Sequence, residues 1–263
     1  MIPRILTIAG SDSSGGAGIQ ADIKTIMAMG GYAASAITAI TAQNTTTVDA
    51  IEILSTDIIE AQIQLMLDDI GVDAFKTGML PNVAIIDLVA RIFKDNSSVI
   101  RVVDPVMIAS SGSRLVDKKA IRAYKDELLP LVDILTPNIP EAETLLAKKI
   151  STREDQLDAA SALQHMTKGY VLLKGGHSQD ETVLDILHCP NGRQLYFEHA
   201  RIPTNHTHGT GCSLASAIAC LAVTHSVEDA AEKAIEYVNQ AIVTAPGLGK
   251  GFGPINHHLA VIV

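Results

Sequence analysis

The chain has 263 residues, a formal net charge of −9 and an isoelectric point near 5.4. Such an acidic protein lacks the basic surface that nucleic acid requires, so we predict no nucleic-acid partner. Hydrophobic residues make up 47% of the chain and Trp is absent, so we expect a large aliphatic core.

Short apolar runs alternate with amphipathic stretches, and no low-complexity linker separates them. The expected strands are Ile5–Ala9, Ala33–Ile40, Asp73–Thr77, Val99–Val103, Ile134–Thr136, Tyr170–Lys174, Val183–His188 and Gln194–His199. The first expected helix runs from near Ile19 to Gly30, and the second starts at Asp57 and is roughly a dozen residues long. The other expected helices are Val83–Phe93, Lys118–Leu129, Glu141–Ala147, Glu154–His165, Gly211–Thr224 and Val227–Thr244. This alternation predicts an α/β fold of one domain, residues 1–263, with a mostly parallel sheet between two layers of helices.

Apolar segment length and cysteine spacing indicate where in the cell the protein works and whether it crosses a membrane. No segment reaches the roughly 18 apolar residues that a membrane span needs, so we expect no membrane partner. The apolar start is too short for a signal peptide. The three cysteines, Cys189, Cys212 and Cys220, form no CxxC pair and indicate neither a zinc site nor a disulfide framework. We therefore expect a cytoplasmic protein.

Polar, glycine-rich motifs follow several of the predicted strands, and in parallel sheets ligands bind at the carboxyl ends of strands. The loop from Gly10 to Gly18 joins a strand to a helix whose first turn favours anions. A tight structural turn explains this loop equally well.

A second glycine-rich stretch, His208-Gly209-Thr210-Gly211-Cys212, opens another predicted helix. Its glycines bare the amides of the first turn, which can hold a phosphoryl oxygen. We expect the helix dipole to lower the pKa of Cys212 below its usual value of about 8.5. A glycine-rich helix entry with an inert cysteine is the alternative.

Three further motifs combine a strand end with a polar side chain. Asn138 and Glu141 can share the water shell of Mg²⁺ and the phosphates of ATP, or can form an ordinary capping box. Asp104 and Lys174 place a carboxylate and a cation at two other strand ends. A lone residue of either kind is more often solvated than functional.

Together these motifs resemble the hydroxymethylpyrimidine/phosphomethylpyrimidine kinases of the ribokinase superfamily. The resemblance rests on eight segments in register: residues 10–24, 38–45, 76–80, 104–107, 136–141, 174–177, 206–212 and 249–257. It implies a three-layer ribokinase-like fold, ATP with Mg²⁺ as the donor, a small pyrimidine alcohol or its phosphate ester as the acceptor, and a homodimer.

The resemblance also implies roles for individual residues. Gln43, Asp12, Ala17, Met79 and Val106 would bind the pyrimidine; Asn138, Glu141, Lys174 and Asp104 would bind the nucleotide, with Glu141 acting on the metal through Mg²⁺-ATP; and Gly209, Thr210, Gly211 and Cys212 would form the anion hole. Cys212 occupies the position at which many sugar kinases of the superfamily carry an aspartate base, so we expect it to assist proton removal from the alcohol.

Two other functions are compatible with parts of this pattern. A pyridoxal kinase would share the Gly-Thr-Gly-Cys element, but the stretch from Thr41 to Thr45 favours the pyrimidine enzymes. A non-catalytic sensor of the pyrimidine would bind ligand without turning over ATP, and would not need Asn138, Glu141 or Lys174, which are all present.

Overall fold

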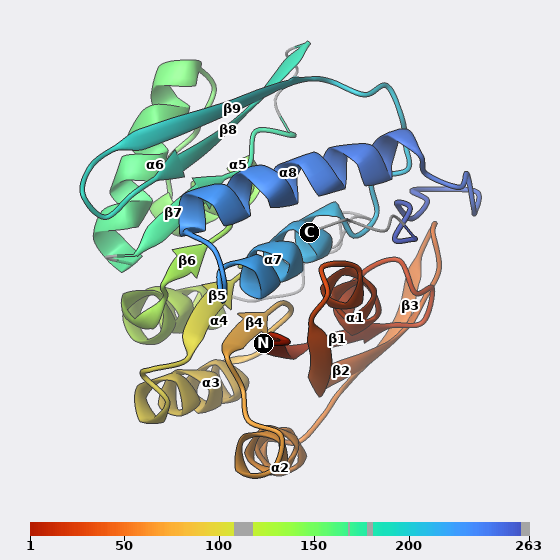
Figure 1. Ribbon diagram of the computed structural model, residues 1–263, viewed down its shortest axis with the longest axis vertical. Helices are drawn as coiled ribbons and strands as arrows, with labels where there is room; N and C mark the ends of the chain where they lie inside the picture. The colour runs from red at the N-terminus through yellow and green to blue at the C-terminus, as the bar shows by residue number, and fades with distance from the viewer. Residues whose placement is uncertain (108–117, 168, 178–180, 259–263) are drawn as a thin grey trace.

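The computed structural model describes residues 1–107, 118–167, 169–177 and 181–258 of the chain. Within these residues nine strands form one sheet in the order β3-β2-β1-β4-β5-β6-β7-β8-β9 (Figure 1). The strands are β1 (Arg4–Asp12), β2 (Tyr32–Gln43), β3 (Val48–Ile53), β4 (Ala74–Thr77), β5 (Ile100–Val103), β6 (Ile134–Leu135), β7 (Tyr170–Leu173), β8 (Thr182–His188) and β9 (Gln194–Ala200). Six neighbouring strands run parallel to one another: β2, β1, β4, β5, β6 and β7. Antiparallel pairing adds β3 at one edge, and β8 followed by β9 at the other.

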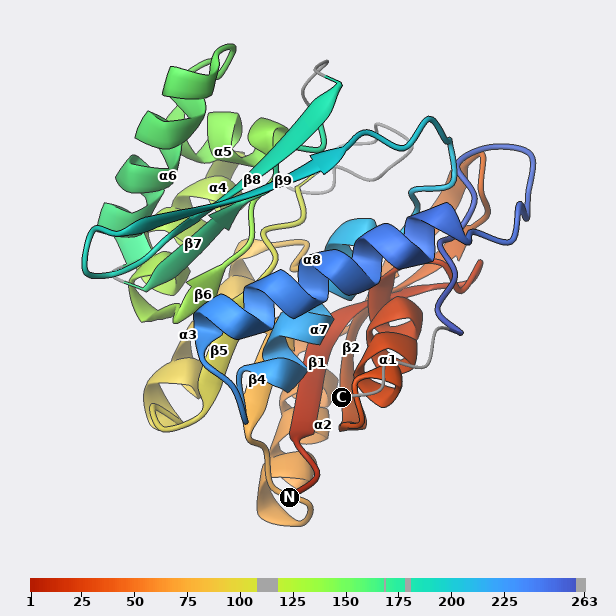
Figure 2. The ribbon, with the colours of Figure 1, turned by 45° about the horizontal axis from the view of Figure 1, so that its top comes forward.

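Helices cover both faces of the sheet, as the alternation of strands and helices predicted. The helices are α1 (Gly18–Ala28), α2 (Thr56–Asp68), α3 (Val83–Asp95), α4 (Lys118–Ala123), α5 (Ile139–Leu146), α6 (Arg153–Thr167), α7 (Thr210–Leu221) and α8 (Val227–Val243). One layer holds α1, α7 and α8, and the other holds α2 to α6 (Figures 1 and 2). The expected three-layer α/β architecture is confirmed.

Each central strand supplies side chains to two separate cores because successive residues of a strand point to opposite faces. Ile5 packs toward α1, α7 and α8, whereas its neighbour Leu6 packs toward α2 to α6. Val102 and Val103 of β5 divide in the same way. This double burial explains why the parallel strands read as continuous apolar runs rather than as alternating patterns.

Two elements differ from the sequence prediction. Strand β3 was not predicted, because it is exposed on both faces and lacks a buried apolar period. The single helix expected over Lys118–Leu129 is wrong in its second half. There the chain forms a π-turn over Tyr124–Leu128 and a 3₁₀ turn that contains Pro130, a residue without the N–H that would extend an α-helix.

The chain order of the strands reverses beside β1, which lies between β2 and β4. Crossover connections leave in opposite directions from such a point, and a crevice opens there beyond the carboxyl ends of the strands. The loops after β1, β2, β4, β5, β6 and β7 all reach this edge, and the start of α7 lies beside them.

Candidate active site

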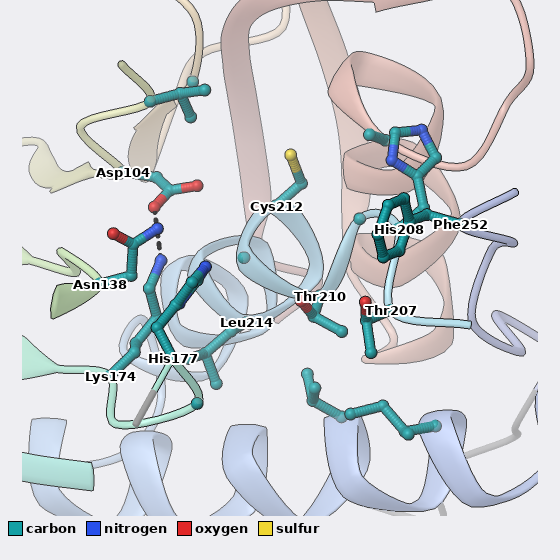
Figure 3. A pocket seen from close by; sticks show the side chains of 18 of the residues that line it. Asp104, Asn138, Lys174, His177, Thr207, His208, Thr210, Cys212, Leu214 and Phe252 are labelled. Carbon is teal, nitrogen blue, oxygen red and sulfur yellow. Dashed lines mark hydrogen bonds and ion pairs between the residues drawn. The ribbon is translucent and has the colours of Figure 1, made fainter. Parts of the chain in front are cut away.

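A cavity of about 780 Å³ lies at the carboxyl edge of the sheet. It is large enough for a nucleotide and a small acceptor together. Figure 3 shows Asp104 and Lys174 on one side, His208 and Phe252 on the other, and Cys212 between them at the start of α7. The cavity wall includes every site residue predicted from the sequence: Asp12, Ala17, Gln43, Met79, Asp104, Val106, Asn138, Glu141, Lys174, Gly209, Thr210, Gly211 and Cys212.

Asp12 anchors the loop after β1 at the end of the cavity that Gln43 and His208 line. Its carboxylate accepts hydrogen bonds from the amides of Ser14 (2.8 Å) and Ala17 (2.8 Å), so the loop curls around one buried charge. Nε2 of His208 lies 2.8 Å from Oδ2 of Asp12. Burial opposes ionisation of Asp12, but the hydrogen bonds from His208 and Ser14 outweigh it and hold the pKa of this carboxyl below its usual value.

Gln43, the last residue of β2, lies beside this buried pair. Its Nε2 is 3.5 Å from Nε2 of His208, and its Oε1 accepts a hydrogen bond from Thr41 (3.3 Å). A primary amide offers an acceptor and a donor side by side. That pair complements an aminopyrimidine edge, in which an amino group neighbours a ring nitrogen.

The two glycine-rich loops contact each other at the centre of the site. Gly209, the residue before α7, has φ of +86°, a conformation that side chains rarely adopt. A Cβ atom at this position would also collide with the carbonyl oxygen of Gly16. Glycine is therefore required where the first turn of α7 meets the loop after β1. The first-turn amides of a helix have no acceptor within the helix, and Gly211 and Cys212 line the cavity.

Cys212 lies in the first turn of α7, as predicted, but the expected lowering of its pKa is wrong. Burial raises the pKa of the thiol to about 11. The positive charge of Lys76 and a hydrogen bond from the Gly18 amide lower it, while Asp22 and Asp104 raise it further. Desolvation of a thiolate thus outweighs the helix dipole, so Cys212 is a thiol at neutral pH.

Asn138 and Glu141 open α5 at the end of the cavity that Lys174 lines. Oδ1 of Asn138 accepts from the Glu141 amide (2.9 Å), and Oε2 of Glu141 accepts from the Asn138 amide (2.8 Å). The capping box considered from the sequence is therefore present. Both residues also line the cavity, so capping and ligand binding are compatible. Burial raises the pKa of Glu141 to about 7, against the opposing charge of Lys174.

Lys174 and Asp104 form an ion pair that borders the cavity. Nζ of Lys174 lies 2.9 Å from Oδ1 of Asp104, and their side chains are 13% and 3% exposed. Burial alone would lower the pKa of Lys174, but Asp104 and Glu141 reverse this effect and raise it. A permanent cation therefore stands between two carboxyl groups, 3.2 Å from where a Cβ of Gly211 would lie. This arrangement suits an anionic phosphate.

The donor atoms at this end fit magnesium. Carboxylate oxygens of Glu141 and Asp104 and the amide oxygen of Asn138 are hard ligands of the kind that Mg²⁺ binds, with waters completing its shell. The described residues hold no group of three or more His, Cys, Asp or Glu side chains that would cage a metal by themselves. A metal that arrives with a nucleotide fits this sparse set.

Several residues of the cavity wall had no role in the sequence prediction. His208 and Phe252 lie in motifs that carried the resemblance, so position in a motif was the available signal. Asp185 lies on β8 and accepts a hydrogen bond from the Gly175 amide (2.7 Å), which holds the loop of Lys174. It had no signal, because a polar residue in a hairpin strand is unremarkable.

Residues 249–257, called the tail segment here, include Phe252, which lines the cavity on the same side as His208 (Figure 3). The Phe252 amide donates to the carbonyl of Thr45 (3.0 Å), and the His208 amide donates to the carbonyl of Gly253 (3.0 Å). The loop after β2 and the entry to α7 are thus joined through the tail segment.

An α/β sheet with an anion-binding helix start, a lysine and a carboxylate at its carboxyl edge defines a phosphate-handling enzyme. The sequence profile described as phosphomethylpyrimidine kinase matches residues 12–256, and the chain belongs to this family. The hydroxymethylpyrimidine/phosphomethylpyrimidine kinase of Bacillus subtilis is 42% identical over 97% of this chain and 95% of its own length.

Two other proteins are similar to this chain over nearly its whole length. The thiamine biosynthesis bifunctional protein ThiED of Geobacter sulfurreducens is 44% identical over 97% of this chain, which spans only 52% of that longer protein. A crystal structure of the Bacillus subtilis pyridoxal kinase with ADP superimposes with a TM-score of 0.91, at 35% identity, over 98% of both chains. The fold is ribokinase-like, as the resemblance implied.

Proposed function

We propose that this protein is a kinase that transfers the γ-phosphoryl group of ATP to 4-amino-5-hydroxymethyl-2-methylpyrimidine, and then to the resulting monophosphate, in thiamine biosynthesis. The observation that carries the proposal is one cavity with an amide-bearing Gln43 at one end, the Lys174–Asp104 pair at the other and the start of α7 between them. The names of relatives that match nearly the whole chain support the same reaction.

The transfer itself depends on positioning and charge. The acceptor oxygen attacks the γ-phosphorus, the bond from that phosphorus to the β–γ bridging oxygen breaks, and ADP leaves. The amides of Gly211 and Cys212 stabilise the charge on the transferring group, and the ammonium of Lys174 neutralises the β- and γ-phosphates. Mg²⁺ bound to ATP, held near Glu141 and Asn138, would supply further charge neutralisation.

Cys212 matters chiefly when the acceptor is the alcohol. The alcohol must lose a proton, whereas the phosphate ester already carries an anionic oxygen. We propose that the Cys212 thiolate accepts the alcohol's proton. Because its pKa is about 11, the rate on the alcohol should rise with pH from 7 to 9, and the rate on the phosphate ester should not. Cys212→Ser should lower the alcohol rate about 100-fold; an unchanged rate contradicts the base role.

The test of the function is ADP release by the purified protein with Mg²⁺-ATP and one of three acceptors: the hydroxymethylpyrimidine, its monophosphate or pyridoxal. We expect turnover of both pyrimidines, with pyridoxal much slower. Gln43→Leu removes both the carbonyl and the amino group of the side-chain amide at similar volume, and should raise KM for the pyrimidines. Binding of the pyrimidine without ADP release would instead indicate a sensor.

Pyridoxal phosphorylation is the second candidate, because the pyridoxal kinase of Bacillus subtilis superimposes over nearly the whole chain. Against it, Gln43 faces the acceptor end of the cavity, where an amide suits the aminopyrimidine edge. Turnover of pyridoxal alone would favour this alternative.

We further propose one domain and a cytoplasmic homodimer. The continuous nine-stranded sheet supports the single domain. Exposed apolar side chains at Ile40, Ile51 and Ile53 on β2 and β3 support self-association. The three free thiols suit a reducing compartment. No helix among the described residues is long and apolar enough to cross a bilayer. A monomer by light scattering would contradict the dimer.

A further inference from the structure

A second Lys–Asp pair lies beneath the floor of the cavity and has no part in the proposed transfer. Lys76 on β4 contacts both carboxylate oxygens of Asp22 on α1, at 2.8 and 2.9 Å. Both side chains are 0% exposed. The hydroxyl groups of Thr7 (2.5 Å) and Ser216 (2.8 Å) also donate to Asp22. One carboxylate thus joins β1, β4, α1 and α7.

The network reaches the reacting centre through a matched pair of helix faces. On α7, Cys212 and Ser216 are four residues apart and share a face; on α1, Gly18 and Asp22 do the same. The Gly18 amide donates to the thiol of Cys212, and Ser216 donates to Asp22 one turn deeper. Lys76 of β4 contacts Asp22 where these two helix faces meet. The thiol of Cys212 therefore lies one helical turn from the serine that binds the buried pair.

We propose that Lys76 is a positioning residue for phosphoryl transfer, whose ammonium is held by Asp22 beside the face of α7 that carries Cys212. Desolvation of a buried lysine and aspartate is expensive, and apolar residues of similar volume can replace such a pair without loss of stability. Charge in this position therefore points to a role besides packing.

The charged groups around the thiol come from four elements. Lys76 of β4 favours the thiolate of Cys212, and so does Lys174 after β7; Asp22 of α1 and Asp104 after β5 oppose it. Lys76 exerts the largest of the charge effects on Cys212. Removing the charge of Lys76 should therefore raise the pKa of the Cys212 thiol, whereas removing an uncharged hydrogen bond of the same network should leave it nearly unchanged.

The experiment measures the rate at which iodoacetamide alkylates Cys212 at pH 8.5, identified by peptide mass spectrometry. Only the thiolate reacts, but a thiolate of higher pKa is also more nucleophilic, so the rate falls about threefold for each unit by which the pKa rises. We expect Lys76→Met to react at least about threefold more slowly than wild type.

Two further variants separate charge from structure. Ser216→Ala removes a hydrogen bond of the network but no charge, and should react within about twofold of wild type. The double variant Lys76→Met/Asp22→Asn leaves a neutral core that folds even if a single variant does not, and should react more slowly than wild type. The proposal is overturned if Lys76→Met reacts at the wild-type rate, if Ser216→Ala slows the reaction as much as Lys76→Met does, or if the double variant reacts at the wild-type rate.

The consequence for turnover rests on the proposed function and is measured separately. Lys76→Met should lower kcat on the alcohol more than kcat on the phosphate ester, with little change in KM for either. Because alkylation reads the thiol itself, it can support the role of Lys76 even in a protein that turns over neither pyrimidine. Failure of the kinase assay and failure of this inference are thus distinguishable.

Discussion

Two Lys–Asp pairs lie at the same edge of the sheet and differ mainly in their access to solvent. The Lys76–Asp22 pair is sealed between β1, β4, α1 and α7, while the Lys174–Asp104 pair borders the cavity. A sealed pair cannot reach a ligand and acts only on its protein neighbours. An open pair can exchange its internal contact for a ligand's phosphate. The same two residue types thus hold protein elements together in the sealed pair and are available to a ligand in the open pair.

The largest expected effect comes from breaking the sealed pair. Lys76→Met leaves the carboxylate of Asp22 in a dry core without its counterion. We expect the free energy of unfolding to fall by about 3–5 kcal/mol, measured by urea denaturation. Lys76→Met/Asp22→Asn should recover much of this loss, because no unpaired charge remains. Equal losses in the two variants would show that the cost lies in packing rather than in charge.

Breaking the open pair should damage catalysis instead. Lys174→Met removes the cation that faces the phosphates, and kcat/KM for ATP should fall about 10²–10³-fold. Its effect on unfolding should be smaller than that of Lys76→Met, because water reaches Asp104 through the cavity. The control is Lys94→Met, which removes an exposed lysine paired with Glu127. Turnover within tenfold of wild type would refute the binding role of Lys174.

The third prediction uses Glu141, the second carboxyl group beside the open pair. Burial raises its pKa to about 7 from an ordinary value of 4.5. The folded protein therefore holds a proton that the unfolded chain releases, so this stabilisation is present below pH 4.5 and is lost as pH rises through 7. Wild type should lose about 1–3 kcal/mol relative to Glu141→Gln between pH 4.5 and 8. Parallel stability curves for the two proteins would contradict the raised pKa.

The smallest effect is expected at a fully exposed pair. Arg91 and Glu60 form two hydrogen bonds on the surface, at 2.8 and 2.9 Å, with side chains 53% and 39% exposed. Water replaces such contacts with little loss, so Arg91→Met should not change the midpoint of urea denaturation measurably. A clear shift would mean that ion-pair geometry, rather than access to solvent, decides the effect in this protein.

The sequence predicted most strands and helices because the parallel strands are apolar on both faces and the helices carry regular apolar stripes. It did not predict β3, whose exposed side chains leave no period to detect. Every predicted site residue lies in one cavity, since strand ends of a parallel sheet meet at one edge. Their individual roles remain predictions.

What the sequence could not supply was the balance of forces at each group. The helix dipole at Cys212 was visible in the sequence, but the burial that outweighs it depends on how α1 and α7 pack. Lys76 was part of a recognised motif, yet its partner Asp22 is distant in the sequence. Such contacts arise from tertiary packing, to which local patterns are blind.

The tail segment has a practical consequence for building fusions of this enzyme. Tension on residues 249–257 would act at once on Thr45 and on the entry to α7, because backbone hydrogen bonds tie both to this segment. The first residue of β1, Arg4, lies at the other end of a nine-residue strand from Asp12, about 26 Å from the cavity's edge. A tag or a second enzyme attached ahead of β1 would therefore leave the cavity undisturbed, whereas a short rigid linker after the tail segment would strain both the loop after β2 and the entry to α7.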